Sequence, residues 1–128
     1  MEVVLDASAL IAMLRKEPGG AAVADVLARA RMSVVNFAEV VSHFLHAGVP
    51  LAELQEMLAT IRLSLVDADL ELAWMAGRLR GTTAEAGLSL GDRFCLALGA
   101  RDRLPVWTAD RQWRTVADKL GVEIVLIR

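Results

Sequence analysis

The sequence contains a single cysteine, Cys95, which excludes an intramolecular disulfide. The apolar run FCLALGA around Cys95 is typical of a small buried side chain rather than of a nucleophile. No apolar run approaches the length of a membrane span. No basic segment precedes an apolar stretch at the N-terminus, as a secretory signal would require. We therefore expect a soluble, cytoplasmic protein with no membrane partner.

An excess of charge of one sign is also missing. The chain carries 14 basic and 16 acidic side chains, which gives a formal net charge of −2. It therefore lacks the broad positive field of many nucleic-acid-binding domains, and contact with nucleic acid would require a local basic patch or metal ions. Hydrophobic residues, in contrast, make up 55% of the chain, which is enough for a packed core and argues against disorder.

Strand-like apolar segments alternate with amphipathic helical patterns along the chain. We predict strands at residues 2–6, 32–35, 63–66, 105–108 and 122–127. We predict helices at residues 8–17, 21–31, 36–47, 51–61, 68–80, 90–102 and 111–119, with a loop that could contain additional helix over residues 81–87. This alternation predicts a parallel sheet covered by helices on both faces. Functional residues in such sheets gather beyond the carboxyl ends of the strands.

Four acidic residues fall where predicted strands end or where the next helices begin. Asp6 ends the first strand in VVLDASAL, and Asp110 follows the fourth in VWTADR. Glu39 lies early in the helix after the second strand, and Asp92 lies near the start of the helix in LSLGDRFCLAL. Four carboxylates at one sheet edge would repel one another unless cations neutralise them. Their oxygen atoms favour Mg²⁺ or Mn²⁺, and such ions suit the attack of water on a phosphodiester.

Helix capping is a simpler interpretation for three of these acids taken singly. Residues 36–39 (NFAE) and 89–92 (SLGD) have the spacing of an N-cap followed by an acidic residue in the first turn. Asp110 could cap the last helix. Capping explains Asp6 less well, because Ser8 is better placed to cap the first helix. Both interpretations can hold together, since a capped first turn fixes a metal ligand rigidly.

The segments that carry these acids resemble, in order and spacing, the motif series of PIN-domain ribonucleases. The nearest resemblance is to VapC-type toxins of bacterial type II toxin–antitoxin systems. The segments are VVLDASALIAML, VVNFAEVV, LSLGDRFCLALGA and VWTADRQW, and the resemblance spans nearly the whole chain. It implies a single PIN-like nuclease domain over residues 1–128, with a three-layer α/β/α sandwich around a mainly parallel central sheet.

The resemblance also implies an activity. It is an endoribonuclease activity that depends on one or two Mg²⁺ or Mn²⁺ ions and acts on structured RNA such as transfer or ribosomal RNA. The implied partners are the RNA substrate, a cognate antitoxin protein and a second copy of the chain in a homodimer. The implied catalytic and metal-binding residues are Asp6, Glu39, Asp92 and Asp110. The small polar residues that match positions beside these acids are Ser8, Asn36 and Thr108, and we expect them to orient the carboxylates by hydrogen bonds.

Two arginines directly follow acids of this set. Arg93 follows Asp92, and Arg111 follows Asp110. Each guanidinium could bind a substrate phosphate through paired hydrogen bonds, or could pair with a neighbouring carboxylate as part of the structure.

Two other functions remain open from the sequence. Asp6 could be the nucleophile of a phosphatase, but the haloacid-dehalogenase-like pattern requires a second aspartate where this chain has Ser8. The domain could also be a non-catalytic, partner-binding module of the same fold, whose acids cap helices or hold a structural metal. The presence of acids at all four family positions favours the nuclease over both.

Overall fold

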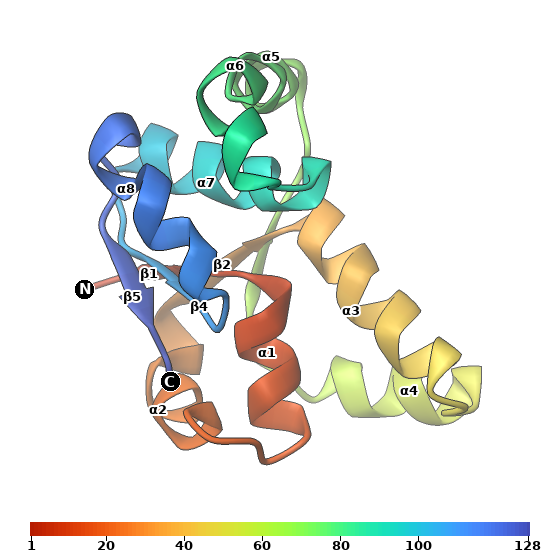
Figure 1. The fold of residues 1–128 in the computed structure, drawn as a ribbon. Helices are drawn as coiled ribbons and strands as arrows, with labels where there is room; N and C mark the ends of the chain where they lie inside the picture. The colour runs from red at the N-terminus through yellow and green to blue at the C-terminus, as the bar shows by residue number, and fades with distance from the viewer.

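The computed structural model describes residues 1–128 and is built around a five-stranded, fully parallel sheet (Figure 1). The strands are β1 (Val3–Leu5), β2 (Ala30–Ser33), β3 (Ser64–Val66), β4 (Val106–Thr108) and β5 (Ile124–Leu126), in the spatial order β3-β2-β1-β4-β5. The central strand β1 pairs with β2 on one side and with β4 on the other. The strand order therefore reverses direction at β1, which is where parallel sheets place ligands.

Helices cover both faces of this sheet. They are α1 (Ala7–Leu14), α2 (Gly20–Val26), α3 (Val34–His46), α4 (Leu51–Ala59), α5 (Leu70–Arg78), α6 (Arg80–Thr83), α7 (Leu90–Asp102) and α8 (Arg114–Leu120). Short 3₁₀ turns are η1 (Leu27–Arg29), η2 (Ala84–Ala86) and η3 (Arg111–Trp113). In Figure 1, α3 and α4 form a pair that extends away from the sheet, on the other side of the molecule from α8. No helix combines the length and hydrophobicity needed to cross a lipid bilayer.

Alternation along β1 divides the core into two layers. Val3 and Leu5 pack with residues of α1, α2, α3 and α4, whereas Val4 packs with residues of α5, α7 and α8. This division follows from the two-residue period of a strand, which sends neighbouring side chains to opposite faces. The α/β/α sandwich with a parallel central sheet is therefore confirmed.

The second β–α junction lies two residues earlier than predicted. The apolar run 32–35 indicated a strand, but β2 ends at Ser33 and α3 begins at Val34. The Ser33 hydroxyl accepts a hydrogen bond from the Val35 amide at 3.1 Å and so caps α3. Asn36 consequently lies inside the first turn of α3, and the prediction that it caps this helix is wrong.

Two other predicted helices differ at their ends. The helix predicted over residues 21–31 stops at Val26, and Ala30 already begins β2. Ala30 and Met32 are buried at alternate positions of that strand. Two alternating positions are too few to distinguish a strand from a helix in the sequence. The helix predicted over residues 111–119 begins with the 3₁₀ turn η3 and continues as α8. The helix predicted over residues 90–102 forms at those residues as α7.

Two glycines in helices differ sharply in the space around them. A Cβ atom added to Gly99 of α7 would collide with Cγ2 of Val106 in β4. Nothing lies within 4 Å of a Cβ atom added to Gly77 of α5. The close packing of α7 on the sheet therefore depends on the missing side chain at position 99.

We expect Gly99→Ala and Gly77→Ala to change stability in opposite directions. Overpacking at residue 99 costs about 1–3 kcal/mol, of which the better helix propensity of alanine offsets up to about 1 kcal/mol. Gly77→Ala gains only the propensity term and should raise the free energy of unfolding by about 0.5–1 kcal/mol. Urea denaturation of both variants measures the difference, and equal effects would contradict the packing described here.

Candidate active site

The carboxyl ends of β1 and β4 bring Asp6 and Thr108 into contact. Thr108 Oγ1 donates a hydrogen bond to Asp6 Oδ2 at 2.9 Å, and Ser8 Oγ donates to the same oxygen at 2.6 Å. The Ser8 hydroxyl also accepts from the Ala109 amide at 2.9 Å, which fixes it to the segment after β4. Asp6 Oδ2 is thus held by two hydroxyls, while no protein donor contacts Oδ1.

The first helix begins two residues earlier than the capping interpretation requires. Helix α1 starts at Ala7, so Ser8 lies within its first turn and the prediction that Ser8 caps this helix is wrong. Asp6 occupies the N-cap position but makes no side-chain capping hydrogen bond. The side chains of Asp6 and Ser8 therefore form hydrogen bonds with each other and with Thr108 rather than with the backbone amides at the start of α1.

Asp6 is an unusual carboxyl group because it is almost completely buried. Its exposed fraction is 4%, and burial raises its pKa from 3.8 to about 6. The hydrogen bonds from Ser8 and Thr108 lower the pKa, and the negative charges of Asp92 and Glu39 raise it further. A buried carboxylate in this setting gains from any cation that reaches its free oxygen.

Glu39 is held by a side chain that links two helices. Asn36 Nδ2 donates to Glu39 Oε1 at 2.7 Å within α3, and to the backbone carbonyl of Gly91 in α7 at 2.9 Å. Asn36 is fully buried, and its Oδ1 has no hydrogen-bond partner in the protein. An unpaired buried acceptor is costly, so a donor is expected at this position when the site is complete.

Gly91 gives the Glu39 carboxylate the room that it occupies. A Cβ atom added to Gly91 would lie 2.5 Å from Glu39 Oε2. The sequence analysis missed this residue. The sequence feature that could have indicated it is a glycine in the first turn of a predicted helix. Glycine is about 1 kcal/mol less favourable there than alanine, so its presence indicates a steric constraint.

Asp92 and Asp110 both cap helices, as the capping interpretation predicts. Asp92 Oδ2 accepts from the Ser89 amide at 2.9 Å, and the Asp92 amide donates to Ser89 Oγ at 3.2 Å, which completes a capping box at the start of α7. Asp110 Oδ1 accepts from the Gln112 amide at 2.9 Å and caps η3. Each cap uses one carboxylate oxygen and leaves the other without a protein donor.

The charges of the four acids act on one another. The negative charge of Asp92 raises the pKa values of Asp6 and Glu39, and that of Asp110 raises the pKa of Asp92. For Glu39 and Asp92, burial is the largest cause of the raised pKa. The structure therefore places the four acids predicted from the sequence at one edge of the sheet, close enough to repel one another.

The acids fit a hydrated divalent cation better than a closed ligand cage. No three histidine, cysteine, aspartate or glutamate side chains converge tightly enough to hold a metal directly. The site instead offers carboxylate oxygens without a protein donor on Asp6, Asp92 and Asp110. Mg²⁺ prefers hard oxygen ligands and usually keeps several of its waters, which can span the remaining distances.

Arg93 and Arg111 make no ion pair. The arginines that do pair with acids are Arg15, Arg31, Arg101 and Arg128. Arg93 Nε donates to the Ser89 carbonyl at 3.3 Å, and its charge lowers the pKa of Asp92 slightly against the dominant effect of burial. The interpretation of Arg93 and Arg111 as ion-pair partners is therefore wrong, and both guanidinium groups remain available to an anion.

Comparisons with solved structures agree with this fold. VapBC-5 from Mycobacterium tuberculosis, a toxin–antitoxin system, is 29% identical with a TM-score of 0.68, and the match covers 98% of each chain. DNA-bound VapBC from Salmonella typhimurium is 20% identical with a TM-score of 0.73, covering 100% of this chain and 99% of that one. FitAcB from Neisseria gonorrhoeae is 19% identical with a TM-score of 0.74, covering 98% and 97%. A search of curated protein sequences finds no significant match.

A comparison with protein-family models gives a match to the PIN domain over residues 3–119. The matched range contains all four acids and the polar residues that hold them. The family resemblance noted from the four sequence motifs is confirmed over most of the chain, with the parallel sheet and the acidic edge in the expected places. The chain therefore belongs to the PIN domain family.

Proposed function

We propose that this protein is a Mg²⁺- or Mn²⁺-dependent endoribonuclease and the toxin of a toxin–antitoxin pair. The observation that carries the proposal is the set of four carboxylates at the sheet edge. Asp6, Glu39 and Asp92 repel one another there and Asp110 repels Asp92, a concentration of negative charge that a cation would neutralise. Membership of the PIN domain family and the likeness to solved toxin–antitoxin complexes support it. In this proposal residues 1–128 form one nuclease domain, and the protein acts in the cytoplasm.

In the proposed mechanism the four acids bind the metal, and different neighbouring side chains hold Asp6 and Glu39 in place. Asp6, Glu39, Asp92 and Asp110 would hold one or two divalent cations. When bound, such a cation activates water for attack on phosphorus and neutralises charge on the phosphoryl oxygens. Ser8 and Thr108 keep Asp6 in one rotamer, and Asn36 does the same for Glu39. Arg93 and Arg111 would bind the phosphates that flank the cleaved bond.

An apolar hollow between α3 and α4 supports an antitoxin partner. It is lined by Phe37, Val41, Leu51, Leu54, Gln55, Leu58 and Ala59. Leu51 is 54% exposed, which is unusual for a large apolar side chain unless a partner covers it. The hollow suits the apolar face of an antitoxin helix, because an amphipathic helix lays apolar residues from successive turns into grooves of this kind.

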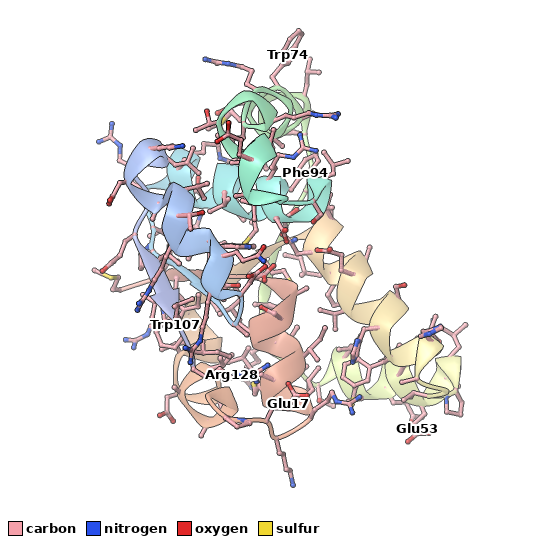
Figure 2. The ribbon with its side chains drawn as sticks, in the orientation of Figure 1. Glu17, Glu53, Trp74, Phe94, Trp107 and Arg128 are labelled. Atoms are coloured by element: carbon pink, nitrogen blue, oxygen red, sulfur yellow. The ribbon has the colours of Figure 1, made fainter.

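A second exposed apolar surface supports a homodimer. Trp74 is 67% exposed and Leu70 is 75% exposed, and both lie on α5. Figure 2 shows Trp74 projecting from α5 away from the rest of the molecule. We propose that a second copy of the chain covers this surface, since tryptophan is enriched where protein interfaces exclude water.

Removal of either the metal or an acid tests the activity. The purified protein should cleave total RNA in Mg²⁺ and not in EDTA. Asp6→Asn and Asp92→Asn should each lower the cleavage rate by about 100-fold or more, because each substitution removes a metal ligand. Asp25→Asn is the matched control, since Asp25 is exposed on α2, outside the site. If the site variants cut as fast as the parent, the assignment of these acids to the active site is wrong. If the parent itself cuts no RNA, the protein is a non-catalytic binding module.

The raised pKa of Asp6 predicts a stability effect without metal. Because its pKa is 3.8 when unfolded and about 6 when folded, the folded state binds more protons between these values. The free energy of unfolding therefore falls by up to about 3 kcal/mol as the pH rises through this window. Asp6→Asn removes the buried charge and should stabilise the protein in EDTA at about pH 8. That gain should vanish below about pH 4. Urea titrations across this range measure it, and a gain independent of pH would argue against a buried charge at Asp6.

Gly91→Ala should damage the site without damaging the fold. The added methyl displaces the Glu39 carboxylate, so we expect cleavage to fall about 10- to 100-fold. The melting temperature should stay the same or rise, since alanine favours the helix. If the effect acts through Glu39, Gly91→Ala will add little to Glu39→Ala in the double variant. Losses that simply multiply would show that Gly91 acts by another route.

A further inference from the structure

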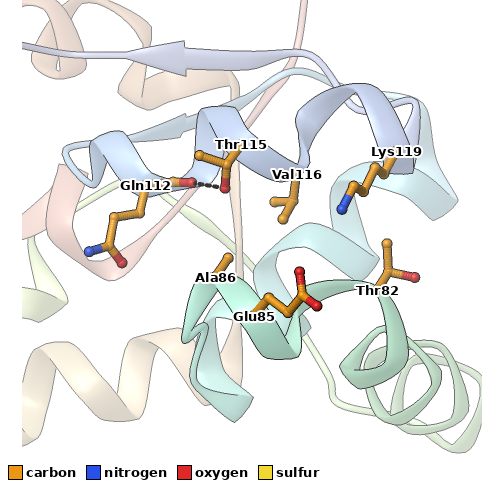
Figure 3. Close-up of a pocket in the computed structure, with 7 residues that line it drawn as sticks. All are labelled: Thr82, Glu85, Ala86, Gln112, Thr115, Val116 and Lys119. Carbon is orange, nitrogen blue, oxygen red and sulfur yellow. Dashed lines mark hydrogen bonds between the residues drawn. The ribbon is translucent and has the colours of Figure 1, made fainter.

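A polar hollow of about 370 Å³ lies beside the acidic edge, between η2 and α8. It is lined by Thr82, Glu85, Ala86, Gln112, Thr115, Val116 and Lys119 (Figure 3). In Figure 3, Gln112 lies at one end of the hollow and Thr82 and Lys119 at the other, with Glu85 between them. Its volume lies within the range of small-ligand sites in proteins.

The polar side chains around this hollow are largely unused by the protein. Thr115 donates its hydroxyl to the Gln112 backbone carbonyl at 2.8 Å. The side chains of Thr82, Glu85, Gln112 and Lys119 make no hydrogen bond or ion pair within the molecule. One space is therefore surrounded by a carboxylate, an amide, a hydroxyl and an ammonium group. The short helical segments that carry these side chains fix the positions of their backbone atoms.

The hollow is coupled to the acidic edge through Asp110. Its carboxylate accepts from the Gln112 amide at 2.9 Å, so a residue of the proposed site caps the turn that carries Gln112. One residue, Arg111, separates them along the chain, which sets their Cα atoms about 5–7 Å apart. A group bound at Gln112 is therefore a close neighbour of the acidic edge at which the cleaved phosphodiester would lie.

The chemistry of the lining selects among nucleotide groups. A phosphate is disfavoured, because Glu85 would repel it. An unpaired nucleobase fits better, since its flat face can contact Ala86 and Val116 and its edge can bond with amide and carboxylate groups. Gln and Glu side chains are among those that read base edges, the amide pairing with adenine and the carboxylate accepting from amino groups.

We propose that this hollow binds one unpaired nucleobase next to the cleaved phosphodiester, and that Gln112 and Glu85 set which base is accepted. The inference rests on the proposed ribonuclease function. It makes single-stranded or looped RNA the substrate, because a base inside a helix cannot turn into the hollow. Lys119, at the far end, supplies a positive charge for the backbone of the same strand.

The test is the base preference of cleavage. The full chain, Gln112→Ala and Glu85→Gln are each incubated in Mg²⁺ with a single-stranded RNA pool that contains a randomised segment, and the 5′ ends of the products are sequenced. Glu53→Gln and Asp25→Asn are the controls, because both residues lie exposed and away from this hollow, on α4 and α2. The parent should prefer one base at one position beside the cut.

We expect Gln112→Ala and Glu85→Gln to reduce or change that preference by about tenfold, while the controls keep it. A purely structural defect would slow cleavage at all sequences equally and leave the preference intact. A parent that cleaves with no preference, or variants that keep the parent's preference, would overturn the assignment of this hollow while leaving the ribonuclease proposal in place. A parent that cleaves no RNA would overturn both.

Discussion

The burial of one carboxylate among others is the constraint on which this structure depends. Asp6 lies at the end of the central strand, where the sheet topology brings other segments to the same edge. Its charge is unfavourable there, because burial and the neighbouring acids both oppose ionisation. The surrounding residues do not remove that cost. The hydroxyls of Ser8 and Thr108 fix only one oxygen and leave the other without a protein donor.

Two other acids of this site are fixed by hydrogen bonds that cap the starts of helices. Asp92 and Asp110 each accept a capping hydrogen bond through one carboxylate oxygen. This bond stabilises the start of a helix and also fixes the direction of the carboxylate. The sequence already allowed capping and metal binding to hold together. The structure shows that each cap uses one of the two carboxylate oxygens and leaves the other without a protein donor.

Much of the fold and the approximate place of the site could be predicted from local patterns. Apolar strands alternating with amphipathic helices determine a parallel sheet, and the acids that follow those strands then share an edge. The boundaries of α7 followed from the capping box at Ser89 and Asp92, which is a local signal. The start of α3 could not be predicted in this way, because Val34 and Val35 favour a strand until the capping bond of Ser33 is known.

Contacts that depend on how distant helices pack could not be found in the sequence. The bond from Asn36 to the Gly91 carbonyl joins residues 55 positions apart, and the steric role of Gly91 toward Glu39 follows from the same packing. The hollow beside η2 is lined by two segments distant in the sequence, residues 82–86 and 112–119, so its shape depends on how they pack and could not be predicted. The absence of ion pairs at Arg93 and Arg111 could likewise not be predicted, because it depends on the positions of all neighbouring acids.

The bond between Asn36 and Gly91 has a mechanical consequence. Helix α3 packs in one core layer and α7 in the other, on opposite faces of the sheet. Asn36 therefore ties the two layers together at the site itself, and Glu39 is positioned by both. Any tilt of α3 relative to α7 would therefore have to break the bond from Asn36 to Gly91 or turn Asn36 away from Glu39.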